Sequence, residues 1–136
     1  MRHPLHPALV HFPVACWTLA VAADFVSLFS VESAWRWSAG LLAIGCSMAV
    51  PAMLAGLLEL PRVPEGQPLR DTYWHMSANL LAFTLFTTRL LVGLDNWQPV
   101  APDAVALWLD AVGLIGLGGG GWLGGRLVYG HGIGRS

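Results

Sequence analysis

Four long apolar segments, separated by short polar breaks, make up most of this chain. The segments run over residues 8–29, 37–60, 72–94 and 104–129. Each is close to the ~20 residues that an α-helix needs to cross the hydrocarbon core of a bilayer. Short connections are typical of antiparallel neighbours in a helical bundle. The pattern therefore predicts an all-α membrane protein, a single domain over residues 1–136, whose four transmembrane helices form an up-down bundle with both termini on the same side.

The composition supports a membrane location and excludes several functions. Of the 136 residues 55% are hydrophobic and 11% are charged, whereas a soluble domain averages about 25% charged residues. The net charge of -1 leaves no basic patch for nucleic acid. Cys16 and Cys46 lie inside apolar segments, which favours buried free thiols over a disulfide. No Ser–His–acid set, phosphate-binding glycine loop or Cys-x-x-Cys pair indicates an enzyme, so we expect a binding or electron-transfer protein.

The arginines are divided unequally between the two ends of the predicted bundle. Arg36 alone lies in the loops opposite the termini. Five lie on the side of the termini: Arg2, Arg62, Arg70, Arg126 and Arg135. Cytoplasmic loops of membrane proteins carry the excess of positive charge. Both termini are therefore predicted to face the cytoplasm.

All the histidines are predicted to lie at that same cytoplasmic end. They are His3, His6, His11, His75 and His131. Imidazole is the side chain that most often binds a metal ion or a haem iron near neutral pH. The convergence favours a cofactor site, with a buried polar network that only fixes helix packing as the alternative.

The first segment contains a conflict between two of its polar residues. Pro7 is a suitable first helical residue, which would place His6 at the cap and His11 just over one turn inside. An ideal helix puts Asp24 about 140° around the axis from His11. Both cannot face the bundle axis unless Pro13 rewinds the helix. The sequence leaves this conflict open.

One face of the third segment carries its polar residues, so this face is expected to look into the bundle. Asn79 lies one turn beyond His75 and is predicted to orient it as a ligand. Arg89, on the same face, lies near the opposite surface, at a depth similar to Asp24 and Asp110. A buried arginine needs a carboxylate, so we predict a charge cluster of these three residues, structural in preference to a proton path.

The fourth segment is rich in glycine. Gly116, Gly120 and Gly124 recur at four-residue spacing, a pattern that lets helices approach closely, within the bundle or in a homodimer. The His131 face includes Gly120 and Gly124, and a trough there would also admit a flat macrocycle. The sequence shows no internal repeat.

The first and last motifs together resemble one known family. They are His6-Pro7-Ala8-Leu9-Val10-His11-Phe12-Pro13 and the glycine-rich run from Gly120 to Gly132, with Asp24, His75 and Arg89 between them. This combination resembles the DUF2231 family of predicted membrane proteins over essentially the whole chain. The resemblance implies a four-helix protein of the bacterial inner membrane. It also implies a relationship to b-type cytochromes, and the joining of some members to iron–sulfur domains favours electron transfer.

Haem b is the leading cofactor hypothesis. His6 or His11 would be one axial ligand and His75 the other, and His131 with the remaining N-terminal histidine would allow a second haem. Asn79 would orient His75, while Arg2, Arg70 and Arg126 would bind the propionates. Electrons would pass to or from a quinone or a redox protein.

Two alternatives belong to other functional classes. Three or four of the histidines His6, His11, His75 and His131 could hold a Cu, Zn, Fe or Ni ion in a closed cluster. Alternatively, the protein is a cofactor-free accessory subunit whose histidines line an interface, with a homodimer through the glycine-rich fourth helix.

Overall fold

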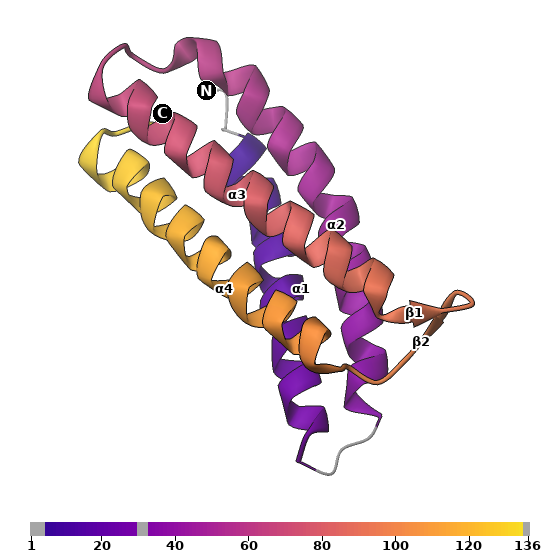
Figure 1. The fold of residues 1–136 in the computed structure, drawn as a ribbon. Coiled ribbons are helices and arrows are strands. Elements are labelled where there is room, and N and C mark those ends of the chain that lie inside the picture. The colour runs from indigo at the N-terminus through magenta and orange to yellow at the C-terminus, as the bar shows by residue number, and fades with distance from the viewer. Residues whose placement is uncertain (1–4, 30–32, 135–136) are drawn as a thin grey trace.

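The computed structural model describes residues 5–29 and 33–134, so His3, Arg2 and Arg135 lie outside the described residues. In this part of the chain there are four long helices: α1 (Leu5–Ser27), α2 (Ala34–Glu59), α3 (Gln67–Val92) and α4 (Ala104–Gly125) (Figure 1). A 3₁₀ turn, Leu60–Arg62, extends α2, and a π-helical turn, Arg126–Gly130, extends α4. Between α3 and α4, the short strands β1 (Leu94–Asp95) and β2 (Gln98–Pro99) form an antiparallel hairpin.

Three of the helical segments are long and apolar enough to cross a membrane: Leu5–Ser27, Ala34–Arg62 and Ala104–Gly130. At 26 residues α3 is as long as α2, but it is less apolar along its length. The reason is its content of polar side chains, among them His75, Asn79 and Arg89. The protein is thus a helical membrane protein with three strongly apolar helices and one amphipathic helix packed among them.

The helix boundaries differ from the expected ones mainly at the N-terminal ends. α1 begins at Leu5, so His6 lies inside the first turn and is not its cap, and Pro7 occupies a position where a missing N–H costs little. Pro13 lies inside α1, which continues through it as one helix. α3 begins at Gln67, five residues earlier than the apolar pattern indicates, because its first turn is polar.

The bundle is built from two helical hairpins. α1 packs along α2, α3 packs along α4, and contacts within each pair are far more extensive than those between the pairs. The two ends of the described chain lie at one end of the bundle (Figure 1). There, a Cβ placed on Gly134 would lie 4.0 Å from Cγ of Pro7. The C-terminal end of α1, the N-terminal end of α2 and the β1–β2 hairpin lie at the other end.

An aromatic stack at mid-length joins the two hairpins. The rings of Trp17 and Phe86 are stacked with centroids 4.9 Å apart and planes inclined by 18°. Each ring lies on a glycine of its own hairpin: a Cβ at Gly45 would be 2.7 Å from Trp17, and one at Gly113 would be 2.9 Å from Phe86. A larger residue at either glycine would displace its ring, so these glycines position the centre of the core.

Candidate functional site

His6 is held against α2 near the end of the bundle where the chain termini lie. Its Nδ1 atom is 2.7 Å from the carbonyl oxygen of Ala52. The ring fits because α2 has glycine one turn later, and a Cβ at Gly56 would lie 3.1 Å from the same nitrogen. A carbonyl oxygen only accepts, so the neutral His6 ring carries its proton on Nδ1 and leaves a lone pair on Nε2.

His75 is held in the same way against α4. Its Nδ1 is 2.8 Å from the carbonyl oxygen of Gly120, and a Cβ at Gly124 would lie 3.0 Å from Cε1 of the ring. The neutral tautomer therefore again has its proton on Nδ1 and its lone pair on Nε2.

Asn79 covers the His75 ring without using either in-plane nitrogen lone pair. Its amide nitrogen donates to the backbone carbonyl of His75 at 2.8 Å and lies 3.2 Å from each of the two ring nitrogens. Equal distances of this length place the amide over the face of the ring. Asn79 thus packs against His75 from one turn away, as expected from the sequence, and fills the space above Gly120.

The two histidines meet across the boundary between the hairpins. Their ring centroids are 5.9 Å apart, and the planes are nearly perpendicular, at 89°. A small apolar cavity of about 20 Å³ lies beside His6. His6 and Trp17 line it from α1, Asn79 lines it from α3 and Leu117 from α4.

The two hairpins follow one structural plan around this site. In α1 and α3, a histidine is followed eleven residues later by the stacked aromatic residue. In α2 and α4, a glycine against that aromatic residue is followed eleven residues later by a glycine against the histidine. Eleven residues are about three helical turns, so each pair lies on one helix face. The histidine pair therefore lies on an approximate two-fold axis that runs along the bundle.

The other two described histidines lie elsewhere. His11 is exposed on the outer side of α1, so the structure brings His6, not His11, to His75. Because His11 faces outward, Asp24 is buried on the inner face without any rewinding at Pro13, which resolves the conflict in the first segment. The second pair expected for His131 is not formed, because His131 binds an acidic residue of α3.

That residue is Asp71, which the sequence pattern did not single out. Its Oδ2 atom accepts from His131 Nε2 at 2.8 Å and from Arg126 Nε at 3.0 Å, and its Oδ1 accepts from Gln67 Nε2 at 2.7 Å. The hydrogen bond from His131 lowers the pKa of Asp71 below its ordinary value. Arg126 is thus engaged with Asp71, while Arg70 is exposed. The four-residue spacing of Gln67 and Asp71 was the available signal, but both lie in a stretch that the apolar pattern marks as a polar break.

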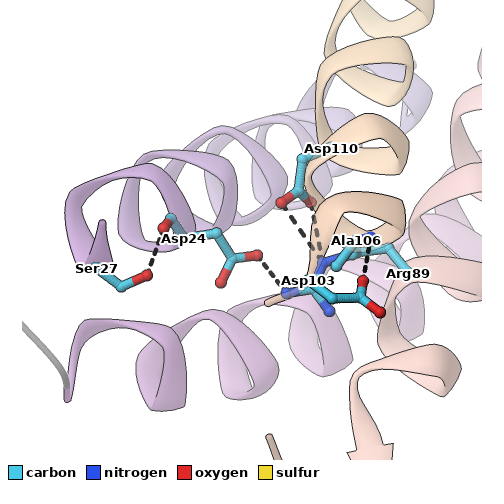
Figure 2. A network of polar contacts seen from close by, with 6 residues as sticks. All are labelled: Asp24, Ser27, Arg89, Asp103, Ala106 and Asp110. Carbon is cyan, nitrogen blue, oxygen red and sulfur yellow. Dashed lines mark hydrogen bonds and ion pairs between the residues drawn. The ribbon is translucent and has the colours of Figure 1, made fainter. Parts of the chain in front are cut away.

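A buried charge cluster lies toward the opposite end of the bundle. Arg89 of α3 donates from Nη2 to Oδ2 of Asp24 in α1 at 2.5 Å (Figure 2). Its Nε is 3.4 Å from Oδ1 and 3.5 Å from Oδ2 of Asp110 in α4. The structure brings together the three residues of the predicted cluster.

The repeated glycines of α4 pack within the protein. Gly116, Gly120 and Gly124 face α3. A Cβ added at these positions would meet Ala82, Asn79 and His75, respectively. α3 therefore fills the trough expected along this face. Four other glycines, Gly118, Gly119, Gly121 and Gly125, have nothing within 4 Å of a Cβ and lie on the outer side. In the part of the chain that the structure describes, no three His, Cys, Asp or Glu side chains are grouped so as to hold a metal ion.

Comparison with family models gives one match. The model described as "Predicted membrane protein (DUF2231)" matches residues 2–136. Comparisons with curated proteins and with solved structures gave no match.

Proposed function

Because the chain belongs to the DUF2231 family of predicted membrane proteins, we propose that it binds haem b through His6 and His75 and transfers electrons in the bacterial inner membrane. The meeting of His6 and His75 across the boundary between the hairpins carries this proposal. Each hairpin supplies one imidazole, and the two ring centroids are 5.9 Å apart in this structure. One imidazole from each side is the protein ligation that a six-coordinate haem b requires.

The hydrogen bonds of both histidines also suit a pair of metal ligands. A ligating imidazole almost always donates its second N–H to a carboxylate, a carbonyl or water, which fixes its tautomer and orientation. Here Ala52 and Gly120 supply the two carbonyl oxygens. Each acceptor belongs to the same hairpin as its histidine, so ring orientation would survive a change in the distance between the hairpins.

The number of ligands favours haem over a bare metal ion. A structural zinc site takes four protein ligands and a catalytic one takes three. The described residues bring only two imidazoles together. A porphyrin supplies four nitrogens of its own and needs only two axial ligands, and bound haem supplies one-electron redox chemistry.

The size of the cavity defines what binding requires. A space of about 20 Å³ does not hold a porphyrin, so the two hairpins must lie farther apart at the histidine end than in this structure. The residues that line the cavity include Ala49 and Ala52, which have small side chains. The limited contact between hairpins makes this separation less costly than separating helices within either hairpin.

The proposal extends to the orientation of the helices in the membrane and to the arginines near the histidine end. α3 would be the fourth transmembrane helix, supported by its 26 residues and by the burial of Arg89 inside the bundle. The histidine end would face the cytoplasm, where Arg70 is exposed and available to a propionate. Arg126 would serve there only after leaving Asp71. A quinone or a redox protein would exchange electrons at this end.

Absorption spectra test the ligand assignment. Protein purified in detergent from cells supplied with a haem precursor should show a Soret band and sharp α and β bands after reduction. His6→Ala and His75→Ala should each abolish the low-spin spectrum, whereas His11→Ala, the matched control on the outer side of α1, should leave it unchanged. A colourless protein from haem-replete cells would contradict the proposal, as would stoichiometric copper or zinc without a Soret band.

A further inference from the structure

The charge cluster at the other end of the bundle is buried with unequal numbers of acids and bases. Asp24 and Asp110 are 0% exposed and Arg89 is 3% exposed. With both carboxylates ionised, this group would carry a net negative charge away from water. An uncompensated charge in such surroundings is expensive, and polar groups inside membrane helices are normally neutralised by a partner or a proton.

The two carboxyl groups do not share the arginine equally. Charge-assisted N–H···O hydrogen bonds are about 2.7–2.9 Å long. Arg89 Nη2 lies 2.5 Å from Asp24, but the closest approach of its Nε to Asp110 is 3.4 Å. Figure 2 shows the same asymmetry: Arg89 is extended toward Asp24, and Asp110 lies beside the Nε atom of Arg89. The short contact makes Asp24 the ion-pair partner of Arg89.

Three buried oxygen atoms around this cluster have no hydrogen-bond partner within the described part of the chain. They are Asp24 Oδ1, Ser38 Oγ and Asp110 Oδ1, the last of which has only the 3.4 Å ion-pair contact with Arg89 Nε. The antiparallel register that places His6 against Gly56 also places Asp24 level with Ser38 in α2. Most buried polar atoms in proteins have a hydrogen-bond partner, so several unpartnered ones at a single level point to an atom or proton that completes them.

We propose that Asp110 carries an exchangeable proton, so that the cluster is a proton-binding site within the membrane. The equilibrium is the addition of H⁺ to one carboxylate oxygen of Asp110, which converts an excess negative charge into a neutral group of three. Protonated Asp110 gains an O–H donor, and buried acceptors lie at this level. This inference does not depend on haem binding, because no atom of the histidine site takes part.

The other groups around the cluster do not supply the missing positive charge. Asp103, at the start of α4, is engaged in capping the helix through the N–H of Ala106. Ser27 donates to the backbone oxygen of Asp24 and is neutral. On α2, Ser38 is neutral, and Arg36 lies against the ring of Trp35 near the end of the bundle. Asp24, Arg89 and Asp110 are therefore the charged groups that face one another.

Infrared difference spectroscopy tests the proposal on the full-length protein in lipid nanodiscs. The wild-type protein should show the C=O stretching band of one buried protonated carboxyl, shifted when H₂O is replaced by D₂O. Asp110→Asn should remove that band. Asp103→Asn, a matched carboxyl at the same end of α4, should retain it.

Thermal unfolding of the same variants gives a second measurement. Asp110→Asn replaces a neutral acid by a neutral amide of the same shape, so its Tm should stay close to that of the wild type. Asp24→Asn removes the ionised partner of Arg89 and should lower the Tm much more. A carboxyl band that persists in Asp110→Asn would overturn the proposal. An Asp110→Asn variant that unfolds, or that is as unstable as Asp24→Asn, would also overturn it. So would a wild-type carboxyl band that disappears when sodium chloride replaces choline chloride, because the site would then hold Na⁺ and not a proton.

Discussion

At the level of His6 and His75 the two hairpins present matching residues, whereas at the level of Arg89 they do not. Both histidines lie on a glycine of the neighbouring helix and are bound to a carbonyl oxygen one turn away. At the other level, the position in α1 that corresponds to Arg89 is Ala20, and the position in α2 that corresponds to Asp110 is Leu42. The approximate symmetry is thus retained at the histidines and lost at the charges.

This difference assigns separate tasks to the two levels. A matched pair of imidazoles on the axis suits a ligand that lies between the hairpins and contacts both alike. At the charged level, a single arginine reaches from the second hairpin to Asp24 in the first. That ion pair ties the hairpins together at one end, while the histidine end has no ion pair between hairpins among the described residues. Under the haem proposal, the hairpins would therefore separate at the histidine end and stay joined at the charged level.

Removing the arginine is expected to have the largest effect. Arg89→Met would leave the buried Asp24 carboxylate without its ion-pair partner. Breaking a buried pair in this way costs about 3–5 kcal/mol. Denaturation in mixed micelles would measure the loss. Arg126→Met is the control, because its side chain is 43% exposed and an ion pair with an exposed partner contributes little to stability. Equal losses in the two variants would contradict the assignment of Arg89 as the tie between hairpins.

A methyl group placed against one histidine would test the matched level. Gly124→Ala brings a Cβ to 3.0 Å from the His75 ring and must shift it. A disturbed ligand orientation typically weakens metal-site affinity about 10–100-fold, so haem titration should show a loss of this order. Gly125→Ala, with nothing within 4 Å, is the neighbouring control and should bind as the wild type does. Equal affinity in both variants would show that His75 is not a ligand in this orientation.

The sequence predicted the helices and the charge cluster better than the histidine site. Apolar runs place α1, α2 and α4 within a few residues, and the depths of Asp24, Arg89 and Asp110 bring them together. Whether His6 or His11 faces inward depends on how α1 is rotated, which the pattern alone left open. The acceptors Ala52 and Gly120 act through backbone carbonyls, for which no residue type is diagnostic.

The repeat and the Asp71 cluster were missed for different reasons. The matching of the hairpins rests on a few histidine, aromatic and glycine positions, because the remaining core residues need only be apolar and of suitable size. No similarity therefore survives between the two halves at most positions. Asp71 was missed because the first turn of α3 is polar, and an apolar pattern does not detect a polar turn at the start of a helix.

The smallest effect is expected at Asp71, which joins α3 to the end of α4 within one hairpin and so does not hold the two hairpins together. The pKa of this carboxyl is lowered from its ordinary value of 3.8, chiefly by the hydrogen bond from His131. A lowered pKa in the folded state gives stability that is present above the ordinary value and is lost as the pH falls through the folded value. Asp71→Asn should therefore lower the Tm near neutral pH, and the difference from the wild type should shrink as the pH falls below the ordinary value of 3.8. A difference that grew on acidification would show that His131 and Arg126 do not stabilise the ionised carboxylate.

Because the ion pair that joins the two hairpins lies elsewhere, the haem affinity of Asp71→Asn should change far less than that of Gly124→Ala.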